Sequence, residues 1–309
     1  MHKDNEIFLN LFGENSLING SVEFPAPDGV DGNKSKVWYF QDREGQKWVV
    51  KQYPEWVHAT DITWIHSYMN KLSQKGFPLA KHVGKAVEYN KQFYAIYSFA
   101  EGTRFDPLNK SHFVDMALKL GQLHILSQDI IVYGNRNWPV VAGFEYRGNH
   151  ESLVYAWNIA SKLLQGTDEG IVMPIHGDYR KDNVRFNQNG VSSVFDFGNA
   201  RNDYPEVDLA IALKDITGKA ESPDLLEKQR EFLQVYKDSN MELPRISPNL
   251  ICASGIILGI QEISYLHSEV STNNDQGINN LLTRESRHLE SLLTNLDGHL
   301  SLYREIFTK

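Results

Sequence analysis

One stretch of the chain, "IHGDYRKDNVRFNQNGVSSVFDFGNA" at residues 175–200, constrains the fold more than any other. Within it, two short runs rich in β-branched and aromatic residues flank the turn letters "NQNG", which predicts a β-hairpin. A hairpin returns the chain to its starting edge, so we expect Asp196 to lie near Asn183. Asp178 stands five residues before Asn183. The stretch therefore predicts that an Asp, an Asn and a second Asp converge from loops at one end of two strands.

The chemistry that needs such a group is phosphoryl transfer. Mg²⁺ prefers hard oxygen ligands and usually takes one or two of them from protein carboxylates, the rest coming from phosphate and water. Asn183 and Asp196 are the candidate metal ligands. Asp178 is then the candidate general base, which orients and deprotonates an acceptor hydroxyl. His176 is interpreted as a residue that shapes the loop, and Asp182 as a bystander.

"HGDYRKDN" followed by "FDFG" resembles the catalytic and metal loops of the aminoglycoside phosphotransferase and choline kinase family, which shares the protein-kinase-like fold. The kinase pattern H-x-D-x-x-x-x-N with a later D-F-G is matched in order and spacing. The resemblance implies an α+β, two-lobed chain. A small antiparallel β-sheet with one helix, residues 1–100, would bind nucleotide, and a larger helical lobe, residues 101–309, would hold the catalytic loop, the metal loop and the acceptor pocket.

The same resemblance implies the cofactors and the reaction. The phosphoryl donor would be ATP, with GTP as the alternative, and the metal would be Mg²⁺. The acceptor would be a hydroxyl group of a small molecule such as an aminoglycoside, choline, homoserine or a thiosugar. An aromatic cage for choline is not indicated, since no Trp follows Trp157. An aminoglycoside site would need clustered acidic residues, and the candidates for these are Glu262, Glu269 and Asp275.

The next family feature is a lysine on the third strand of the β-rich lobe, and "WVVK" places Lys51 there. The resemblance implies that Lys51 grips the α- and β-phosphates of the nucleotide. Family members pair this lysine with a helix Glu, whose expected position falls on or beside Ile65. The helix has no Glu at that point, so Glu55, Asp61 and His66 are the candidate substitutes, and the absence of such a pair is the alternative.

Two further segments are implied to contact the nucleotide. Gly29 and Gly32 precede a strand, where a phosphate-covering loop belongs, although their spacing is not G-x-G-x-x-G. An ordinary turn is the alternative interpretation of this glycine pair. "YAIYSFAEG" ends a strand at the junction of the lobes, so backbone groups of Phe99, Ala100 and Glu101 would meet the adenine ring.

Three residues outside the metal group are assigned supporting roles by the resemblance. Arg180 stands two residues after Asp178, where protein kinases place a cation that contacts the transferring phosphate, although a surface Arg has the same pattern. Asp208, at the start of a helix, would support the catalytic loop, and a simple helix N-terminal acid is its alternative. His124 is interpreted as a packed or hydrogen-bonded structural histidine.

The pattern of the whole chain agrees with a β-rich first part and a helical second part. Hairpins are predicted over 35–53 and 85–99, and a helix over 60–76 with Ile62, Ile65, Met69 and Leu72 on one face. Five helical stretches follow, at 111–128 with Ser111 as N-cap, 151–166, 222–239, 248–270 and 279–307. No repeat and no low-complexity tract occurs.

Composition excludes several classes of partner and compartment. With 309 residues, a net charge of −8 and one cysteine, no nucleic-acid or anionic membrane partner is expected, and no internal disulfide is possible. Cys252 is expected to be a buried, inert thiol. The apolar run "LICASGIILGI" is expected to be a core helix that is too short to span a bilayer. No signal peptide is indicated, the cytoplasm is the expected location, and the oligomeric state is left open.

Three alternatives to a small-molecule kinase can be weighed on the same residues. The missing helix Glu favours a non-catalytic nucleotide-binding protein that keeps the kinase fold, whereas the intact Asp178, Asn183 and Asp196 count against it. A metal-dependent hydrolase would use His176, Asp178 and Asp196 as ligands but ignores Lys51. A protein kinase is disfavoured, because "DFGNARNDYPEVDLA" leads directly to the next helix, without a long activation segment or an A-P-E motif.

Overall fold

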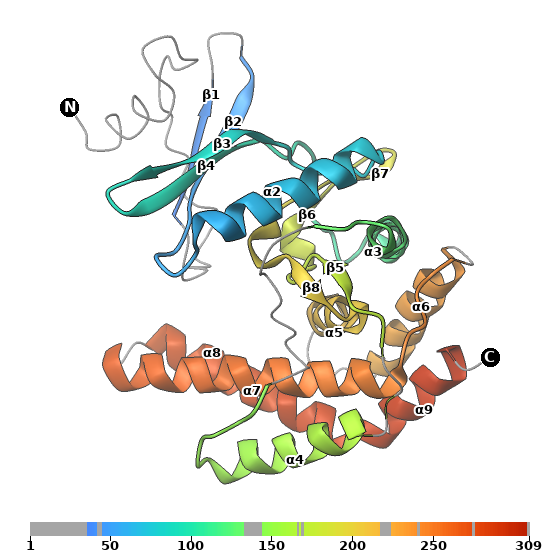
Figure 1. Cartoon of the computed structure of the whole chain (residues 1–309). Coiled ribbons are helices and arrows are strands. Elements are labelled where there is room, and N and C mark those ends of the chain that lie inside the picture. The colour runs from blue at the N-terminus through green and yellow to red at the C-terminus, as the bar shows by residue number, and fades with distance from the viewer. Residues whose placement is uncertain are drawn as a thin grey trace. The chain divides into compact units, whose positions relative to one another are not determined.

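The computed structural model describes residues 36–41, 45–132, 144–165, 167, 170–216, 224–239, 242–273 and 276–307. Contacts between residues divide this part of the chain into two compact units. The first contains the described residues up to Gly102, together with Val132 and Ser192–Phe195. The second contains the other described residues, from Thr103 onward (Figure 1). Gly29 and Gly32 lie outside the described residues, so their predicted role stays a prediction.

The first unit is built on a four-stranded antiparallel sheet with the order β1-β2-β4-β3. Its strands are β1 (Val37–Gln41), β2 (Lys47–Gln52), β3 (His82–Tyr89) and β4 (Gln92–Ser98). The β1–β2 and β3–β4 pairs confirm both predicted hairpins, although β3 begins three residues earlier than the predicted segment. In β2, Lys51 stands opposite Val37 on one side and Ala95 on the other.

One helix, α2 (Ala59–Gln74), belongs to the first unit and confirms the predicted apolar face. Ile62, Ile65, Met69 and Leu72 are all buried, because residues three and four apart share one side of a helix. A carboxylate in the first turn satisfies the start of the helix, where the Asp61 Oδ2 accepts a hydrogen bond from the His58 backbone N–H at 3.0 Å.

The second unit is mainly helical. Its helices are α3 (Lys110–Gln128), α4 (Glu151–Gln165), α5 (Pro205–Ile216), α6 (Leu225–Asp238), α7 (Pro248–Asn273), α8 (Gln276–Thr294) and α9 (Leu296–Phe307). The N-cap of α3 is Asn109, whose side chain accepts the Ser111 backbone N–H at 3.1 Å, so the prediction of Ser111 as N-cap was wrong by two residues. The α+β class, with a small antiparallel sheet and a mostly helical remainder, is confirmed.

Helix α7 forms the centre of the second unit's core. Its side chains Leu250, Ile256, Ile257, Ile260 and Ile263 are buried in one apolar cluster with residues of α4, β5, α5 and α8. The stretch Pro248–Val270 has 23 residues and is long and apolar enough to cross a membrane, so the expectation that it was too short was wrong. The expectation of a core helix is confirmed, because 61% of its most apolar window is buried.

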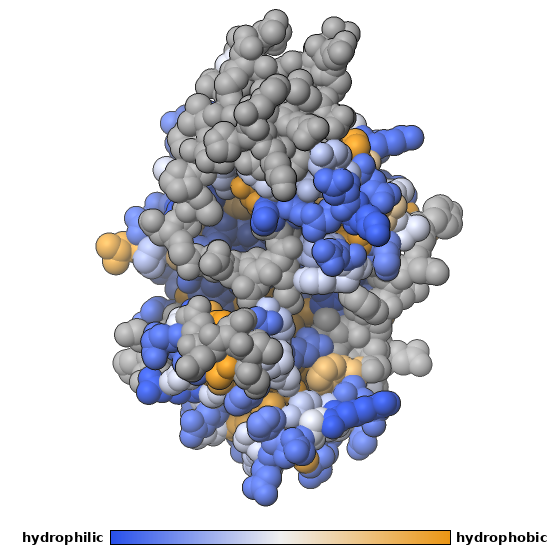
Figure 2. All heavy atoms as spheres, turned by 90° about the vertical axis from the view of Figure 1, so that its left-hand side faces the viewer, coloured by the Kyte–Doolittle hydropathy of each residue, from blue (hydrophilic) through white to orange (hydrophobic). Residues whose placement is uncertain are grey.

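The face shown in Figure 2 carries mostly hydrophilic described residues, with hydrophobic ones in small separate groups. Such a distribution is ordinary for a surface in water.

The last predicted helix, residues 279–307, is two helices. Helix α8 ends at Thr294 and α9 begins at Leu296, with Asn295 between them. Asn, Asp and Gly have low helix propensity, and Asn295, Asp297 and Gly298 crowd this junction.

Short strands carry the polar stretch 175–200, of which Ser192–Phe195 belong to the first unit and the remaining residues to the second. Strand β5 (Met173–Ile175) pairs with β8 (Arg201–Asp203), a pair that the sequence did not predict. Strands β6 (Val184–Asn187) and β7 (Gly190–Val194) form the predicted hairpin. Single turns of 3₁₀ helix, η1 (Lys181–Asn183) and η2 (Phe197–Asn199), stand at the start of β6 and before β8.

Candidate active site

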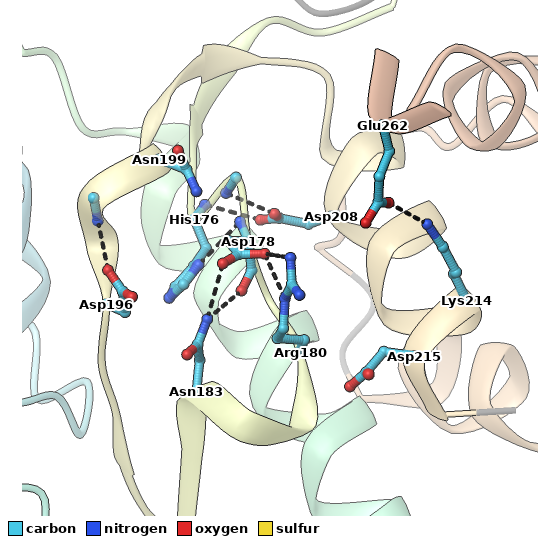
Figure 3. A network of polar contacts seen from close by, with 12 residues as sticks. His176, Asp178, Arg180, Asn183, Asp196, Asn199, Asp208, Lys214, Asp215 and Glu262 are labelled. Atoms are coloured by element: carbon cyan, nitrogen blue, oxygen red, sulfur yellow. Dashed lines mark hydrogen bonds and ion pairs between the residues drawn. The ribbon is translucent and has the colours of Figure 1, made fainter. Parts of the chain in front are cut away.

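The two loops of the predicted site lie at the same end of the β5–β8 pair. Ile175 at the end of β5 stands opposite Arg201 at the start of β8. The loop that follows Ile175 and the loop that precedes Arg201 are therefore brought together by the ladder. This is the convergence that the spacing of Asp178, Asn183 and Asp196 predicted (Figure 3).

Asp208 anchors the first of these loops. Its fully buried carboxylate accepts the backbone N–H groups of His176 at 2.9 Å and Gly177 at 2.8 Å. His124 Nε2 lies 3.4 Å from the same carboxylate, and His124 Nδ1 lies 2.8 Å from the Tyr236 hydroxyl. Burial alone would raise the pKa of Asp208, but the contacts with His124 and His176 hold that pKa below its usual range. Asp208 and His124 thus have the supporting roles that were predicted.

A glycine is required at the turn of the loop. Gly177 has φ +75°, and a Cβ atom at this position would lie 2.1 Å from the Asn199 carbonyl oxygen. Because the obstructing atom belongs to the backbone of the other loop, no side-chain rotation relieves the clash. The missing side chain of Gly177 therefore lets the two loops approach each other.

Asp178 lies at the centre of the polar network. Its Oδ1 accepts a hydrogen bond from Arg180 Nε at 2.6 Å and also contacts the Arg180 terminal nitrogen. Asn183 Nδ2 donates to the Asp178 carbonyl oxygen at 2.9 Å and to Oδ2 at 3.2 Å. The Asp178 backbone N–H donates to His176 Nδ1 at 3.2 Å. These contacts fix the carboxylate while 15% of its side chain remains exposed.

The electrostatic surroundings of Asp178 suit a group that accepts a proton. Burial raises its pKa, the adjacent Arg180 guanidinium partly offsets that rise, and the negative charge of Asp196 adds to it. A carboxylate with a raised pKa is a better base than one in water. Burial alone would lower the pKa of the Arg180 guanidinium, but the negative charges of Asp178, Asp215 and Glu262 raise it, which keeps Arg180 protonated.

Asn183 and Asp196 present oxygen atoms of the kind that Mg²⁺ prefers. Because Asn183 uses its Nδ2 to bind Asp178, its amide oxygen points away from that residue (Figure 3). Asp196 has φ 61°, a left-handed conformation that is uncommon outside glycine, and its Oδ1 accepts the Gly198 N–H at 3.4 Å. One amide oxygen and one carboxylate fit a metal that takes its other ligands from phosphate and water.

No group of three or more His, Cys, Asp and Glu side chains that could hold a metal occurs among the described residues. His176 is fully buried, and its Nδ1 is occupied by the Asp178 N–H. His176, Asp178 and Asp196 therefore do not form the three-ligand set that the hydrolase alternative requires.

Sequence reasoning missed a second anchor of the catalytic loop. Asp215, near the end of α5, accepts the Lys181 backbone N–H at 2.6 Å, and Lys181 Nζ donates to the Asp215 carbonyl oxygen at 3.0 Å. Asp215 thus satisfies the first N–H of η1 in the manner of an N-cap. No local signal could have identified it, because the two residues are 34 positions apart.

Some of the backbone groups that were predicted to contact the nucleotide already form hydrogen bonds within the first unit. The Phe99 N–H donates to the Lys47 carbonyl at 3.1 Å, and the Glu101 carbonyl accepts the Ser192 hydroxyl at 2.8 Å. Within the described chain, the backbone N–H and C=O of Ala100 carry no hydrogen bond. Among the described residues, Ala100 therefore has both backbone groups available to a ligand, whereas Phe99 offers its C=O and Glu101 its N–H.

Residues 29–242 match the model of the phosphotransferase enzyme family known as APH. The match covers more than half of the chain. The chain belongs to this phosphotransferase family. The predicted resemblance and the predicted enzyme class, a small-molecule kinase, are thereby confirmed.

Known proteins similar to this phosphotransferase include a homoserine kinase from Bartonella henselae. It is 26% identical over 231 residues, which cover 67% of this chain and 70% of that protein. Among solved structures, an aminopropanol kinase associated with a microcompartment has a TM-score of 0.73 at 13% identity and covers 96% of this chain and 98% of its own. Amicoumacin kinase hAmiN, in complex with AMP-PNP, Ca²⁺ and Ami, has a TM-score of 0.68 at 14% identity, with 94% and 93% covered. The structural likeness confirms the protein-kinase-like fold of this phosphotransferase.

Proposed function

We propose that this phosphotransferase moves the γ-phosphoryl group of ATP to a hydroxyl of a small molecule in a Mg²⁺-dependent reaction. The observation that carries the proposal is the geometry of Asp178, a partly exposed carboxylate held by Arg180 and Asn183 beside the loop of Asp196. In phosphoryl transfer, catalysis rests mainly on positioning and on charge stabilisation, and this arrangement supplies both.

Asp178 is the general base of the proposed reaction. Its carboxylate accepts the proton of the acceptor hydroxyl as that oxygen forms its bond to the γ-phosphorus, and the bond from phosphorus to the ADP oxygen breaks. Arg180 holds the Asp178 carboxylate in place and brings positive charge to the site, where the transferring phosphoryl group carries negative charge.

The metal would be held by the Asn183 amide oxygen and the Asp196 carboxylate. When bound, Mg²⁺ supplies charge neutralisation at the phosphates. Lys51 would bind the nucleotide phosphates, and the backbone of Ala100 would bind the adenine. Amicoumacin kinase hAmiN holds AMP-PNP and Ca²⁺, which supports a nucleotide and a divalent cation as ligands of this chain.

The acceptor would lie along α7. Glu262 on this helix is close enough to act electrostatically on Arg180, and Figure 3 shows it on the same side of the network as Asp215. The neighbouring turns of α7 contribute Gln261, Ser264 and His267 to an open hollow of about 570 Å³, which residues 144–150 complete. The size is that of a small-molecule site. The homoserine kinase relative makes homoserine the first acceptor to test.

The same proposal places the enzyme in the cytoplasm, without a nucleic-acid or membrane partner. The acidic net charge of −8 and the single cysteine support it.

The experiment is a screen of hydroxyl acceptors (homoserine, amino alcohols, choline, aminoglycosides and thiosugars) with ATP and Mg²⁺, in which ADP release is measured. We expect turnover on one class, and we expect Asp178→Asn to lower kcat by at least about 100-fold while nucleotide binding is kept. Asp182→Asn is the matched control, an exposed Asp of the same loop, and should keep full activity. Asp196→Ala should weaken Mg-nucleotide binding.

Two other outcomes discriminate between classes of protein. If no acceptor gave ADP above background and Mg-ATP did not raise the melting temperature, the kinase proposal would fail. Stabilisation by Mg-ATP without turnover on any acceptor would instead favour a non-catalytic nucleotide-binding protein.

A further inference from the structure

We propose that the ring of Tyr53 positions Lys51, and that a chain of contacts through Tyr97 and His66 to His82 fixes this ring. The chain is a positioning device for nucleotide binding, in the place where family members are implied to use a helix Glu. The inference rests on the proposed role of Lys51 as a ligand of the nucleotide phosphates.

The first contact joins the lysine to an aromatic face. Lys51 Nζ lies 5.4 Å from the centre of the Tyr53 ring, within the range at which a cation is attracted by the negative face of a ring. Lys51 is the penultimate residue of β2, and Tyr53 follows the end of that strand. Tyr53 is 2% exposed, so its ring is a fixed surface rather than a mobile side chain.

The second contact ties Tyr53 to the helix. The Tyr53 hydroxyl is in close contact with the hydroxyl of Tyr97 on β4, and this hydroxyl lies 3.0 Å from His66 Nε2 on α2. The His66 and Tyr97 rings also meet edge to face, with centroids 5.8 Å apart at 80°. A hydroxyl can donate one hydrogen bond and accept another, so Tyr97 can serve both neighbours.

The third contact holds His66. Its ring stacks on His82 of β3 with centroids 3.9 Å apart at 6°. One His82 ring nitrogen lies 3.0 Å from Asn70 Oδ1 and the other lies 3.1 Å from the Gly84 carbonyl, and the neutral ring donates to one of these oxygens at a time. The chain therefore crosses from β2 through β4 and α2 to β3, and each of its members after Lys51 has partners on a separate element.

This device differs chemically from an acid on the helix. The only carboxylate within α2 is Asp61, which satisfies the N–H of His58 at the start of the helix. His66 lies about one and a half turns further along, close to the predicted Glu position at Ile65. Burial beside His82 lowers the pKa of His66 to about 3, so the imidazole is neutral at pH 7. The Tyr53 ring, held through Tyr97 by this neutral imidazole, orients the Lys51 ammonium group without adding a formal negative charge near the phosphates.

The test compares Tyr53→Leu with Tyr53→Phe in the full chain, measuring the Kd of Mg-ATP and of adenosine by calorimetry. We expect Tyr53→Leu, which removes the ring, to weaken Mg-ATP binding about tenfold and to leave adenosine binding unchanged. Tyr53→Phe keeps the ring but loses its hydroxyl contact with Tyr97, so it should weaken Mg-ATP binding only about threefold. Equal loss for Mg-ATP and adenosine would show general damage to the lobe and would overturn the proposal.

A double-mutant cycle with Lys51→Met tests whether the ring acts through the lysine. We expect Tyr53→Leu to cause no further loss of Mg-ATP affinity in the Lys51→Met background, whereas independent action would give the full additional loss of about tenfold. If Lys51→Met left Mg-ATP binding unchanged, the proposed role of Lys51 would fail, and this inference with it. If Lys51→Met weakened binding but Tyr53→Leu did not, this inference alone would fail.

Because truncation of a buried ring can destabilise the fold, Tyr97→Phe is the milder second variant. It removes only the hydroxyl that links Tyr53 to His66, and we expect it to weaken Mg-ATP binding about threefold and adenosine binding not at all. Tyr68→Phe is the matched control, a fully buried tyrosine on α2 whose ring lies at a tilt of 44° to that of Trp64. Equal effects of the two variants on Mg-ATP binding would contradict the chain.

Discussion

Gly177 and Gly76 separate two effects that a glycine substitution usually mixes. Both have positive φ, +75° and +81°, so both become strained when a side chain is added. A Cβ at Gly76 would meet nothing within 4 Å, whereas at Gly177 it would meet the Asn199 carbonyl oxygen at 2.1 Å. We expect Gly76→Ala to cost about 1 kcal/mol of unfolding free energy and Gly177→Ala clearly more.

The two variants are compared by urea unfolding and by kcat with the acceptor identified in the screen. Gly177→Ala should also lower kcat, because the displaced loop carries Asp178, whereas Gly76→Ala should leave kcat unchanged. Equal unfolding free energies for the two variants would show that the two loops can separate at little cost. This result would contradict the expected destabilisation by the clash between a Cβ at Gly177 and the Asn199 carbonyl.

Individual site residues were predictable where the signal was local. The spacing of Asp178, Asn183 and Asp196 was enough, because a hairpin between them determines how their ends meet. Asp215 could not be predicted, and Glu262 was named only as one of three candidate acids for an acceptor, because tertiary packing of α5 and α7 brings both near the catalytic loop. For the helix Glu, the sequence offered Glu55, Asp61 and His66 as candidate substitutes, and the contact of His66 with Tyr97 could not be predicted because it requires the sheet to be known.

Helix α5 contains a buried acid with a pH-dependent cost. Glu206 is fully buried, its Oε1 accepts the Ser247 N–H at 2.7 Å, and its Oε2 has no hydrogen-bond partner among the described residues. Burial raises the pKa of Glu206 from 4.5 to about 7. Below pH 4.5 the acid is protonated in both states. As the pH rises to about 7, the unfolded chain ionises first, and folding stability falls.

We therefore expect Glu206→Gln to remove one pH-dependent component of stability. Between about pH 4.5 and 8, the unfolding free energy of the variant should improve relative to the parent by on the order of 3 kcal/mol, since each pKa unit corresponds to about 1.4 kcal/mol. Urea unfolding across this pH range measures the difference. Glu227→Gln, at an exposed position of α6, is the matched control. A difference that did not change with pH would mean that Glu206 is ionised in the folded state.

Elements were predictable where periodicity was strong. The two hairpins of the first sheet and the apolar face of α2 followed from alternation and from the spacing of apolar residues. The pair β5–β8 was missed because each strand has only three residues, too few to show a period. The break between α8 and α9 was missed because a single unfavourable junction interrupts an otherwise helical pattern.

The integrity of the second unit can be followed through its central helix. Cys252 on α7 is 1% exposed, and burial raises the pKa of its thiol to about 12. Helix α7 packs against α4, α5, α8 and α9, so exposure of this thiol requires most of the unit to open. We expect alkylation of the native protein at about pH 8 to be at least about 1,000-fold slower than alkylation of the urea-unfolded chain, which gives the intrinsic rate.

Mg-ATP then distinguishes a local opening from a cooperative one. A ligand that binds only the folded enzyme lowers the open population by the factor 1 + [L]/Kd. At about 100 times its Kd, Mg-ATP should slow alkylation of Cys252 about 100-fold if the thiol is exposed only in states that have lost the nucleotide site. An unchanged rate in the presence of saturating Mg-ATP would instead show that α7 opens by itself while the nucleotide site stays formed. Because Asp208 on α5 anchors the catalytic loop and α5 packs against α7, we expect the cooperative result.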